Sequence, residues 1–436
     1  MRYSLADVAR VAGGRYSGEP LEVDAYATDS RRASAGTLFF ALKGAELDGH
    51  DFVADAAARG ATGVVVERPL DIAAPQVVVD STWEALFALA ADALHATGPL
   101  AVGVTGSNGK TSTKDFVAAA LGGRYRALKT EGNLNTETGV PLTLLRLEPG
   151  VHTALVAEMG MQGPGEIARL AKLVQPAIGV ITVIGTVHLE FFPSREDLAR
   201  AKGELLEALP PDGVAVLNAD DPYTELLRSL TTARIVTFGG EGADYAVQDY
   251  VGSTFSVRGH EVHLQLPGRH QALNAAAALA VAEAAGVPLA EAAPRLAEVA
   301  PAKGRMREVR AARGFTILDD SYNASPESME AAFAVVAEHP GRRRLAVLGE
   351  MRELGALAGP EHERIGRLAK DVFDGVAVVD TGEAGKLATA AGAELVPDAE
   401  AARLWVQEHA GEGDLVLVKA SRGVALERLV DALVES

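Results

Sequence analysis

The sequence predicts an α/β protein built from three successive domains. Short apolar runs rich in Val and Ile alternate with segments of helical length, a pattern typical of parallel strands that are covered on both faces. With 436 residues the chain exceeds the size that one hydrophobic core supports, since domains usually hold about 100 to 200 residues. The alternation also restarts after a break near residue 304. We therefore expect domains at residues 1–97, 98–303 and 304–436.

The first domain is the smallest. From residue 52, "FVADAAARGATGVVVERP" predicts a short Ala-rich helix, a Gly turn and an apolar strand that Pro69 closes. "QVVVD" predicts another strand, and residues 81–96 predict a helix that ends at "TGP". Gly98 and Pro99 mark a natural boundary, so we expect a small α/β unit before it.

The second domain begins with "LAVGVTG", an apolar run that enters a Gly loop and continues into the helical "STKDFVAAALGG". "HTALVAEMG", "PAIGVITVIGTVHLE" and "DGVAVLNADDP" predict further strands of the same parallel sheet. Residues 241–267 alternate only weakly and predict a small β excursion before the helical "RHQALNAAAALAVAEAAG".

The third domain repeats the alternation. "FTILDDSY", "RRLAVLGEM", "GVAVVDTG" and "DLVLVKASRG" predict four strands, separated by helical segments such as "SPESMEAAFAVVAEH". This order predicts a Rossmann-like, doubly wound domain.

The composition limits what the protein can bind. The formal net charge of −18 repels nucleic-acid phosphates and anionic membrane surfaces, so we expect no nucleic-acid partner. The chain has no cysteine, which removes disulfides, thiolate zinc sites and a thiol nucleophile and leaves oxygen and imidazole as metal ligands. The first residues carry charges, and no apolar run reaches the roughly 20 residues that span a bilayer. We expect a cytoplasmic protein with no membrane insertion.

The stretch "VGVTGSNGKTSTKDF" at residues 102–116 predicts a phosphate-binding loop between a strand and a helix. Gly106 and Gly109 allow backbone N–H groups to converge on an anion, to which the helix adds its positive N-terminus. Lys110 would supply a charge to the β- and γ-phosphates, and the Thr111 hydroxyl is placed to bind Mg²⁺. The spacing is unusual, because Val104 stands where a phosphate-binding P-loop normally has its first Gly.

The alternative is that this stretch is only a tight strand-to-helix turn. The position of G-K-T favours phosphate binding, so we expect a P-loop, ATPase-like central domain. The nucleotide-binding residues of this loop are predicted to be Gly106, Ser107, Asn108, Gly109, Lys110, Thr111 and Ser112.

Two further strands of the central sheet end in groups that can hold a metal. Glu158 closes "TALVAEMG" and His188 lies at the end of "VITVIGTVHLE". Taken alone, each of these residues is more often structural. Because both are expected at strand ends next to the phosphate loop, together they favour a site that binds a metal and a nucleotide. Lys202 lies in an amphipathic helix, where a Lys is usually solvated, and the residues alone give it no role.

The third domain also presents polar side chains where its strands end. "ILDDSYNASP" places two acids, a Tyr and an Asn after a strand, and Ser325 with Pro326 predicts the N-cap and first residue of a helix. A plain polar turn is the alternative. "LGEMRELG" and "LVKASRG" follow neighbouring strands, so we expect one ligand-facing edge. Its charged residues are Glu350, Glu353, Lys419 and Arg422.

A phosphate loop fits several classes of enzyme. A GTPase should carry N-K-x-D, which is absent. A motor ATPase needs no second substrate, whereas two further domains with ligand-facing edges indicate additional small molecules. The residues alone do not decide between a kinase and an ATP-driven ligase.

A family resemblance decides this point. "TGSNGKTST", "EMGMQGPGEI", "HLEFF", "AKGE", "ALNAAAALA", "GRM", "DDSYNASPESM" and "KASRG" have the order and spacing of the Mur ligase family over essentially the whole chain. That family uses a short T-G-x-N-G-K-T loop, which accounts for Val104. Among its members, "ATDSRRASAGTLFFALKGAELDGHDF", "GNLNTETGVPLTLL" and "DDSYNASPES" resemble the ligase that adds D-alanyl-D-alanine to UDP-N-acetylmuramoyl tripeptide. The D-N-P-R signature of the ligase that adds the third residue is absent.

The resemblance implies that ATP and Mg²⁺ are used to form an amide through an acyl phosphate. Lys110 would hold phosphates, Thr111 with Glu158 one Mg²⁺, and His188 a second Mg²⁺ together with a carbamate on Lys202. The remaining nucleotide contacts implied by the resemblance are Asn274, Arg305 and Asp320.

For the other substrates the resemblance implies contacts in all three domains. The UDP end would meet the first domain, the muramoyl peptide would meet the second, and the third would contribute the Tyr322-Asn323 turn. It also implies a monomer that acts in the last cytoplasmic step of the peptidoglycan pentapeptide precursor. Alternatives are the ligase adding the third residue, a folylpolyglutamate-type ligase, or a non-catalytic nucleotide sensor. The candidate substrate residues are Ser30, Arg31, Asn135, Thr136, Tyr322 and Asn323.

Overall fold

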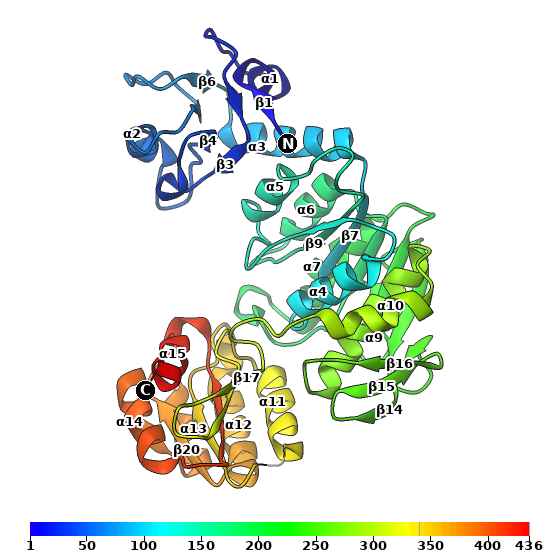
Figure 1. Ribbon diagram of the computed structural model, residues 1–436, viewed down its shortest axis with the longest axis vertical. Helices are drawn as coiled ribbons and strands as arrows, with labels where there is room; N and C mark the ends of the chain where they lie inside the picture. Colours follow the sequence, from blue (N-terminus) through cyan, green and yellow to red (C-terminus); the bar gives the residue numbers. More distant parts are fainter. Residues whose placement is uncertain (340, 436) are drawn as a thin grey trace.

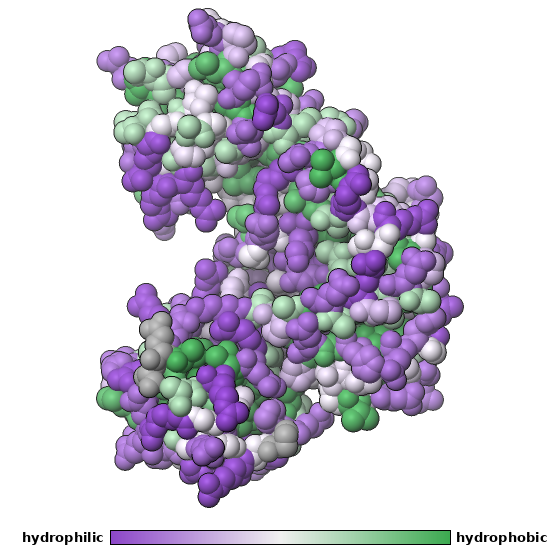
Figure 2. Space-filling model, in the orientation of Figure 1, coloured by the Kyte–Doolittle hydropathy of each residue, from purple (hydrophilic) through white to green (hydrophobic). Residues whose placement is uncertain are grey.

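The computed structural model describes residues 1–339 and 341–435, and it folds into three α/β domains in chain order, as the sequence predicts. In Figure 1 the first and third domains lie apart on one side of the central domain, which gives the molecule the outline of a C. Figure 2 shows a wide hollow between these two domains, with many polar residues along its edges. None of the helices in the described ranges has the length and apolar character needed to cross a membrane.

The first domain contains a sheet of four short parallel strands in the order β3-β4-β5-β6. The sequence predicts β5, β6 and the long helix α3, whose N-cap Ser81 accepts a hydrogen bond from the Glu84 amide. The helix ends at Gly98, whose φ of +58° is the left-handed conformation common where helices end. This end coincides with the predicted domain boundary. The elements are β1 (Tyr3–Ser4), α1 (Leu5–Val11), β2 (Glu22–Val23), β3 (Ala25–Ala27), β4 (Thr37–Phe40), α2 (Val53–Ala58), β5 (Gly63–Val66), β6 (Gln76–Val78) and α3 (Thr82–Thr97).

The central domain contains seven parallel strands in the order β13-β12-β11-β10-β7-β9-β8. The chain passes to one side of β7 for β8 and β9, and to the other side for β10 and the later strands. The carboxyl end of β7 is therefore a topological switch point, where open α/β sheets bind ligands. The first elements are β7 (Leu100–Thr105), α4 (Lys110–Leu121), β8 (Ala127–Lys129), α5 (Gly139–Leu144), β9 (Ala154–Glu158), α6 (Glu166–Val174) and β10 (Ile178–Ile181).

The rest of the central domain adds strands, helices and the predicted β excursion, which is a three-stranded antiparallel sheet in the order β14-β15-β16. Helices α4 and α9 cover one face of the large sheet, largely with small Ala side chains, while α5, α6 and α7 cover the other. The elements are α7 (Arg195–Glu207), β11 (Val214–Asn218), α8 (Thr224–Arg228), β12 (Arg234–Gly239), β13 (Tyr245–Ala246), β14 (Gln248–Val251), β15 (Thr254–Val257), β16 (His260–His263), α9 (Arg269–Ala284) and α10 (Leu289–Arg295).

The third domain contains six strands in the order β17-β18-β22-β19-β20-β21, and only β17 runs antiparallel. The four predicted strands are β18, β19, β20 and β22, and the predicted capping of α11 is confirmed, because the Ser325 hydroxyl accepts from the Ser328 amide. The elements are β17 (Arg307–Arg310), β18 (Thr316–Asp319), α11 (Pro326–Glu338), β19 (Arg344–Leu348), α12 (Ala358–Val372), β20 (Gly375–Val379), α13 (Ala384–Ala391), β21 (Glu394–Val396), α14 (Ala399–His409), β22 (Leu415–Lys419) and α15 (Glu427–Glu435).

The first and central domains share one hydrophobic cluster. Leu89 of α3, Leu144 of α5 and Leu170 of α6 are fully buried in it. The N-terminal amine of Met1 also donates to the carbonyl of Leu145 at 2.8 Å. This packing holds the first domain against the face of the central sheet that carries α5 and α6.

One predicted strand is shorter than expected. β10 ends at Ile181, so His188 is not a strand-end residue. It lies in the following loop with φ +68° and caps the short 3₁₀ helix η3 (Leu189–Phe191). The apolar run after Ile181 packs as a loop, because Ile184 and Val187 are buried there without strand pairing.

Candidate active site between the central and third domains

The phosphate loop joins β7 to α4. Gly106 and Gly109 have φ angles of +147° and +80°, which residues with a side chain rarely adopt. A Cβ atom at Gly106 would lie 1.9 Å from Thr182 Oγ1, and one at Gly109 would lie 2.6 Å from Asn274 Oδ1. Glycine is therefore required at both positions by conformation and by space.

The loop collects groups that suit an anion. The Lys110 ammonium donates to the carbonyls of Gly106 at 2.8 Å and Ser107 at 3.0 Å. Burial lowers the pKa of Lys110, and the nearby Glu158 carboxylate opposes this shift. Ser107 Oγ is buried and has no hydrogen-bond partner within the described residues. A cation, a free hydroxyl and the N-terminus of α4 thus converge, which is the chemistry of a phosphate site.

Glu158 lies at the end of β9, beside this loop, and only 2% of it is exposed. Its carboxylate accepts from Thr111 Oγ1 at 2.9 Å and from Asn135 Nδ2 at 2.8 Å. The buried Lys114 ammonium lies 3.5 Å from the same carboxylate. The structure thus brings together three of the predicted site residues, because the Thr111 hydroxyl and the Asn135 amide both contact the Glu158 carboxylate.

Lys202 is buried, in contrast to the usual solvated helical Lys. It lies on α7 with 1% exposed, and its ammonium donates to the carbonyl of Gly106 at 3.2 Å. Burial lowers its pKa well below the ordinary value, and the charge of Lys110 adds to this shift. Lys202 therefore lies directly behind the phosphate loop, with a pKa that burial shifts toward the neutral amine.

His188 meets the third domain. Its Nδ1 lies 2.5 Å from Glu353 Oε2, and the imidazole of His188 lowers the pKa of Glu353. The contacts of His188 are with Glu353 and not with Glu158 or Lys202, so the implied ligands of a second metal ion are not assembled in this arrangement.

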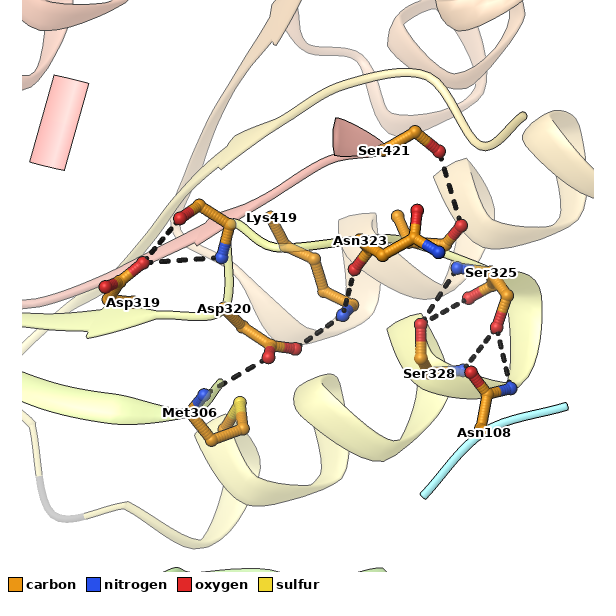
Figure 3. Close-up of polar contacts among 11 residues, drawn as sticks. Asn108, Met306, Asp319, Asp320, Asn323, Ser325, Ser328, Lys419 and Ser421 are labelled. Atoms are coloured by element: carbon orange, nitrogen blue, oxygen red, sulfur yellow. Dashed lines mark hydrogen bonds and ion pairs between the residues drawn. The ribbon is translucent and has the colours of Figure 1, made fainter. Parts of the chain in front are cut away.

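Of the four charged residues predicted at the ligand-facing edge of the third domain, Lys419 and Arg422 line the cavity between the domains, whereas Glu350 and Glu353 do not. Figure 3 shows the contacts of Lys419 at this edge. The Lys419 ammonium pairs with Asp320 Oδ2 and donates to the carbonyl of Asn323 at 3.0 Å. Asp320 Oδ1 accepts from the Met306 amide at 3.1 Å. Asn108 of the phosphate loop donates to the Ser325 hydroxyl at 3.0 Å, so this edge contacts the central domain.

Tyr322 stands next to this edge between two cations. The guanidinium of Arg305 lies 4.1 Å from the centre of its ring, and that of Arg422 lies 5.4 Å from it. Arg422 also donates to the Tyr322 hydroxyl at 3.4 Å. The arrangement concentrates positive charge where a phosphate or a carboxylate would be attracted.

One cavity of about 820 Å³ joins these groups across the two domains. Its volume falls within the range of small-molecule sites. Gly106, which belongs to the loop, and Lys202, which lies behind it, are not among the lining residues. The predicted residues that line the cavity are Ser107, Asn108, Gly109, Lys110, Thr111, Ser112, Asn135, Thr136, Glu158, His188, Asn274, Arg305, Asp320, Tyr322 and Asn323.

The two first-domain candidates lie outside this cavity. Ser30 is buried and Arg31 is exposed, and both belong to a 3₁₀ turn that Asp29 caps. The Arg31 guanidinium pairs with Asp29 at 2.8 Å. Trp83 of α3 lines the cavity, so Ser30 and Arg31 would meet only a ligand that extends from there farther along the first domain.

The residues fit one magnesium ion beside the phosphate loop. In residues 1–339 and 341–435, no three His, Asp or Glu side chains cluster as a ready-made metal site. The Thr111 hydroxyl and Glu158 carboxylate nevertheless adjoin each other at 2.9 Å. Oxygen donors of this kind, completed by phosphate oxygens, are what Mg²⁺ prefers.

Sequence reasoning missed two contacts. Lys114 approaches Glu158 because it follows Thr111 by three positions on α4, a spacing that places both on one helix face. That spacing was available in the sequence. The pairing of His188 with Glu353 was not, because it joins two loops of different domains.

Replacing Gly106 by Ala is expected to weaken ATP binding about tenfold to a hundredfold. Strain at such a backbone costs about 1–3 kcal/mol, and each 1.4 kcal/mol is roughly tenfold in affinity. Calorimetric titration with ATP measures the change. Gly98→Ala is the matched control, because Gly98 also has positive φ but lies outside the loop, and a Cβ atom added there would meet nothing within 4 Å. Unchanged affinity in Gly106→Ala would contradict this account of the loop.

The fold and cavity define a class, a three-domain α/β protein with a P-loop nucleotide site. Family models match all three domains: the Mur ligase catalytic domain at residues 22–95, the Mur ligase middle domain at 104–282 and the Mur ligase glutamate ligase domain at 304–422. The chain is 37% identical to the UDP-N-acetylmuramoyl-tripeptide–D-alanyl-D-alanine ligase of Escherichia coli, over 99% of this chain and 98% of that protein. The chain therefore belongs to the Mur ligase family.

Solved structures agree with this assignment. MurF from Acinetobacter baumannii aligns with a TM-score of 0.91 and 33% identity, over 100% of this chain and 99% of that one. MurF from Thermotoga maritima in complex with ADP aligns with a TM-score of 0.84 and 32% identity, over 94% and 97%. The three-domain architecture expected from the sequence is thus confirmed, because both solved structures align with nearly the whole chain.

Proposed function

We propose that this protein is an ATP-dependent ligase that adds D-alanyl-D-alanine to UDP-N-acetylmuramoyl tripeptide. The observation that carries the proposal is the single cavity in which a phosphate loop faces the ligand edge of a second domain. A nucleotide sensor needs no such second edge. The relatives named for this reaction match the chain over nearly its full length, which supports the same substrates.

The proposed chemistry begins with the terminal carboxylate of the tripeptide. An oxygen of this carboxylate would attack the γ-phosphorus of ATP bound with Mg²⁺, so that an acyl phosphate forms and ADP leaves. The amine of D-Ala-D-Ala would then attack the carbonyl carbon, the nitrogen would lose a proton, and phosphate would leave as the amide forms. Catalysis of this kind depends on positioning and on stabilising charge that spreads over oxygen atoms.

We assign the nucleotide to the phosphate loop. Lys110 would bind the β- and γ-phosphates, and Thr111 with Glu158 would hold Mg²⁺ through the oxygen atoms that already adjoin. Lys202, as a carbamate, would join His188 at a second ion. The remaining proposed nucleotide contacts are Asn274, Arg305 and Asp320, which line the same cavity.

The peptide substrates would occupy the rest of the cavity. Asn135 and Thr136 would meet the muramoyl peptide, and Tyr322 and Asn323 would meet D-Ala-D-Ala. The UDP end would extend to the first domain near Ser30 and Arg31. We further propose domain limits of 1–97, 98–303 and 304–436, a monomer, and a cytoplasmic location in the last step of pentapeptide-precursor synthesis.

Phosphate release from ATP tests the proposed substrates. Release should require UDP-N-acetylmuramoyl tripeptide and D-Ala-D-Ala together, and neither alone should support it. Tripeptide ending in lysine and tripeptide ending in diaminopimelate are both supplied, since either can occupy the third position. Release that needs a folate with glutamate, or the dipeptide precursor with a third amino acid, would overturn the assignment.

A further inference from the structure

The loops that carry His188 and Glu353 meet at the boundary between the central and third domains. Besides the 2.5 Å contact between His188 Nδ1 and Glu353 Oε2, the Glu190 amide donates to the carbonyl of Glu353 at 3.3 Å. A Cβ atom at Gly355 would lie 3.2 Å from Glu190 Cα, so the two backbones approach closely. The contact is therefore part of a packed junction, not an isolated meeting of two long side chains.

Both residues have unusual backbone conformations. His188 has φ +68° and Glu353 has φ +65°, in the left-handed region that non-glycine residues rarely adopt. Such conformations are energetically unfavourable and persist where the surroundings impose them, often at functional sites. Two of them in direct contact across a domain boundary indicate that the position of this pair matters.

The two residues lie differently with respect to the cavity. His188 is among the residues that line it, whereas Glu353 is not. His188 Nδ1 is shielded from solvent and makes no hydrogen bond of regular geometry within the described residues, which leaves the Glu353 carboxylate as its close partner. The ring thus has one nitrogen toward the third domain and the other available to a ligand.

This arrangement matches a general feature of metal sites. A histidine that binds a metal usually directs its other ring nitrogen to a carboxylate, which fixes the tautomer and the ring orientation. We propose that Glu353 is a positioning residue for His188 and holds the imidazole so that Nε2 binds the second divalent cation proposed beside the nucleotide. This inference rests on the proposed function of that site. It adds that the third domain helps to form the metal centre of the central domain.

The plain alternative is an interdomain ion pair. His188 and Glu353 retain side-chain exposures of 20% and 33%, and ion pairs that remain partly exposed contribute little to stability. An ion pair would affect domain docking alone. A positioning residue would also change cation affinity, so the two roles make different predictions.

The variant Glu353→Gln tests the difference, because it keeps the side chain's size and removes its charge. Mn²⁺ binding to the full-length protein with saturating ATP is followed by electron paramagnetic resonance, without either peptide. We expect roughly 10- to 100-fold weaker Mn²⁺ binding, the usual effect of losing such a partner, with ATP affinity in the absence of metal unchanged. Glu353→Asp should recover part of the loss. Wild-type Mn²⁺ affinity in Glu353→Gln would overturn the proposal.

Glu190→Gln is the matched control. It removes a carboxylate from the same junction, two positions from His188, and has no side-chain contact with the imidazole. Its Mn²⁺ affinity should equal that of the wild type. A loss equal to that of Glu353→Gln would show that the charge of the junction, and not the pair, sets the affinity, and would overturn the assignment.

A second measurement needs no variant of Glu353. Nitrogen chemical shifts of ¹⁵N-labelled histidine, with His188 assigned from a His188→Gln sample, report the tautomer in the metal-free protein. The proposal predicts a proton on Nδ1, and a neutral ring protonated on Nε2 would contradict it. Both measurements omit the peptide substrates, so they fail or succeed independently of the ligase reaction.

Discussion

Replacing Glu158 by Gln is expected to lower kcat by about 10²- to 10³-fold, the scale of losing one preorganised group that stabilises the transition state. The carboxylate is buried and contacts Thr111 at 2.9 Å, so both oxygen donors of the proposed magnesium site depend on it. An amide offers one neutral oxygen in place of a charged carboxylate. The shape of the side chain is retained, so the fold should survive.

Steady-state phosphate release at increasing Mg²⁺ measures this effect. The expected result is a collapsed kcat that high Mg²⁺ does not fully restore, with an unchanged circular dichroism spectrum. Glu196→Gln is the control, because Glu196 is an exposed carboxylate of the same domain paired with Arg200 on α7. Near-normal turnover of Glu158→Gln at ordinary Mg²⁺ would exclude Glu158 as a metal ligand.

Removing dissolved CO₂ at low pH is expected to abolish most activity, and bicarbonate is expected to restore it. Burial lowers the pKa of Lys202, so at neutral pH the side chain has more of the neutral amine, the form that combines with CO₂. The product is a carbamate, which replaces a cation by oxygen donors suited to Mg²⁺. The loss should be of the same order as that of Glu158→Gln.

The rate of phosphate release before and after addition of bicarbonate measures this effect. Lys202→Met fills the same buried space without an amine, so its activity should be low at every bicarbonate concentration. Indifference of the wild-type enzyme to bicarbonate would rule out the carbamate. Full activity of Lys202→Met would remove Lys202 from the catalytic groups altogether.

Most of the fold follows from local signals in the sequence. The β7–α4 unit combines an apolar run, a Gly loop and a helical segment, and Ser325 with Pro326 marks the start of α11 as expected. These features depend on neighbours in the chain, so a single sequence contains them. β10 is the exception, because burial of Ile184 and Val187 in a loop produces the same apolar pattern as a strand.

The site was predictable only in part. Gly106 and Lys110 carry a recognisable pattern, whereas Lys202 looks like any solvated helical lysine. It is buried because Leu205, three positions later on the same face of α7, packs against the sheet directly behind the loop. The pairing of His188 with Glu353 depends on how two domains dock, which no local pattern encodes.

We propose that the cavity activates a carboxylate by transferring a phosphoryl group to it. The decisive experiment uses UDP-N-acetylmuramoyl tripeptide whose terminal carboxylate carries ¹⁸O at both oxygens, incubated with ATP and D-Ala-D-Ala. If an acyl phosphate forms, one labelled oxygen leaves with each phosphate, and mass spectrometry should find one ¹⁸O in the released phosphate. Phosphate that is released without label while the peptide product accumulates would contradict this mechanism.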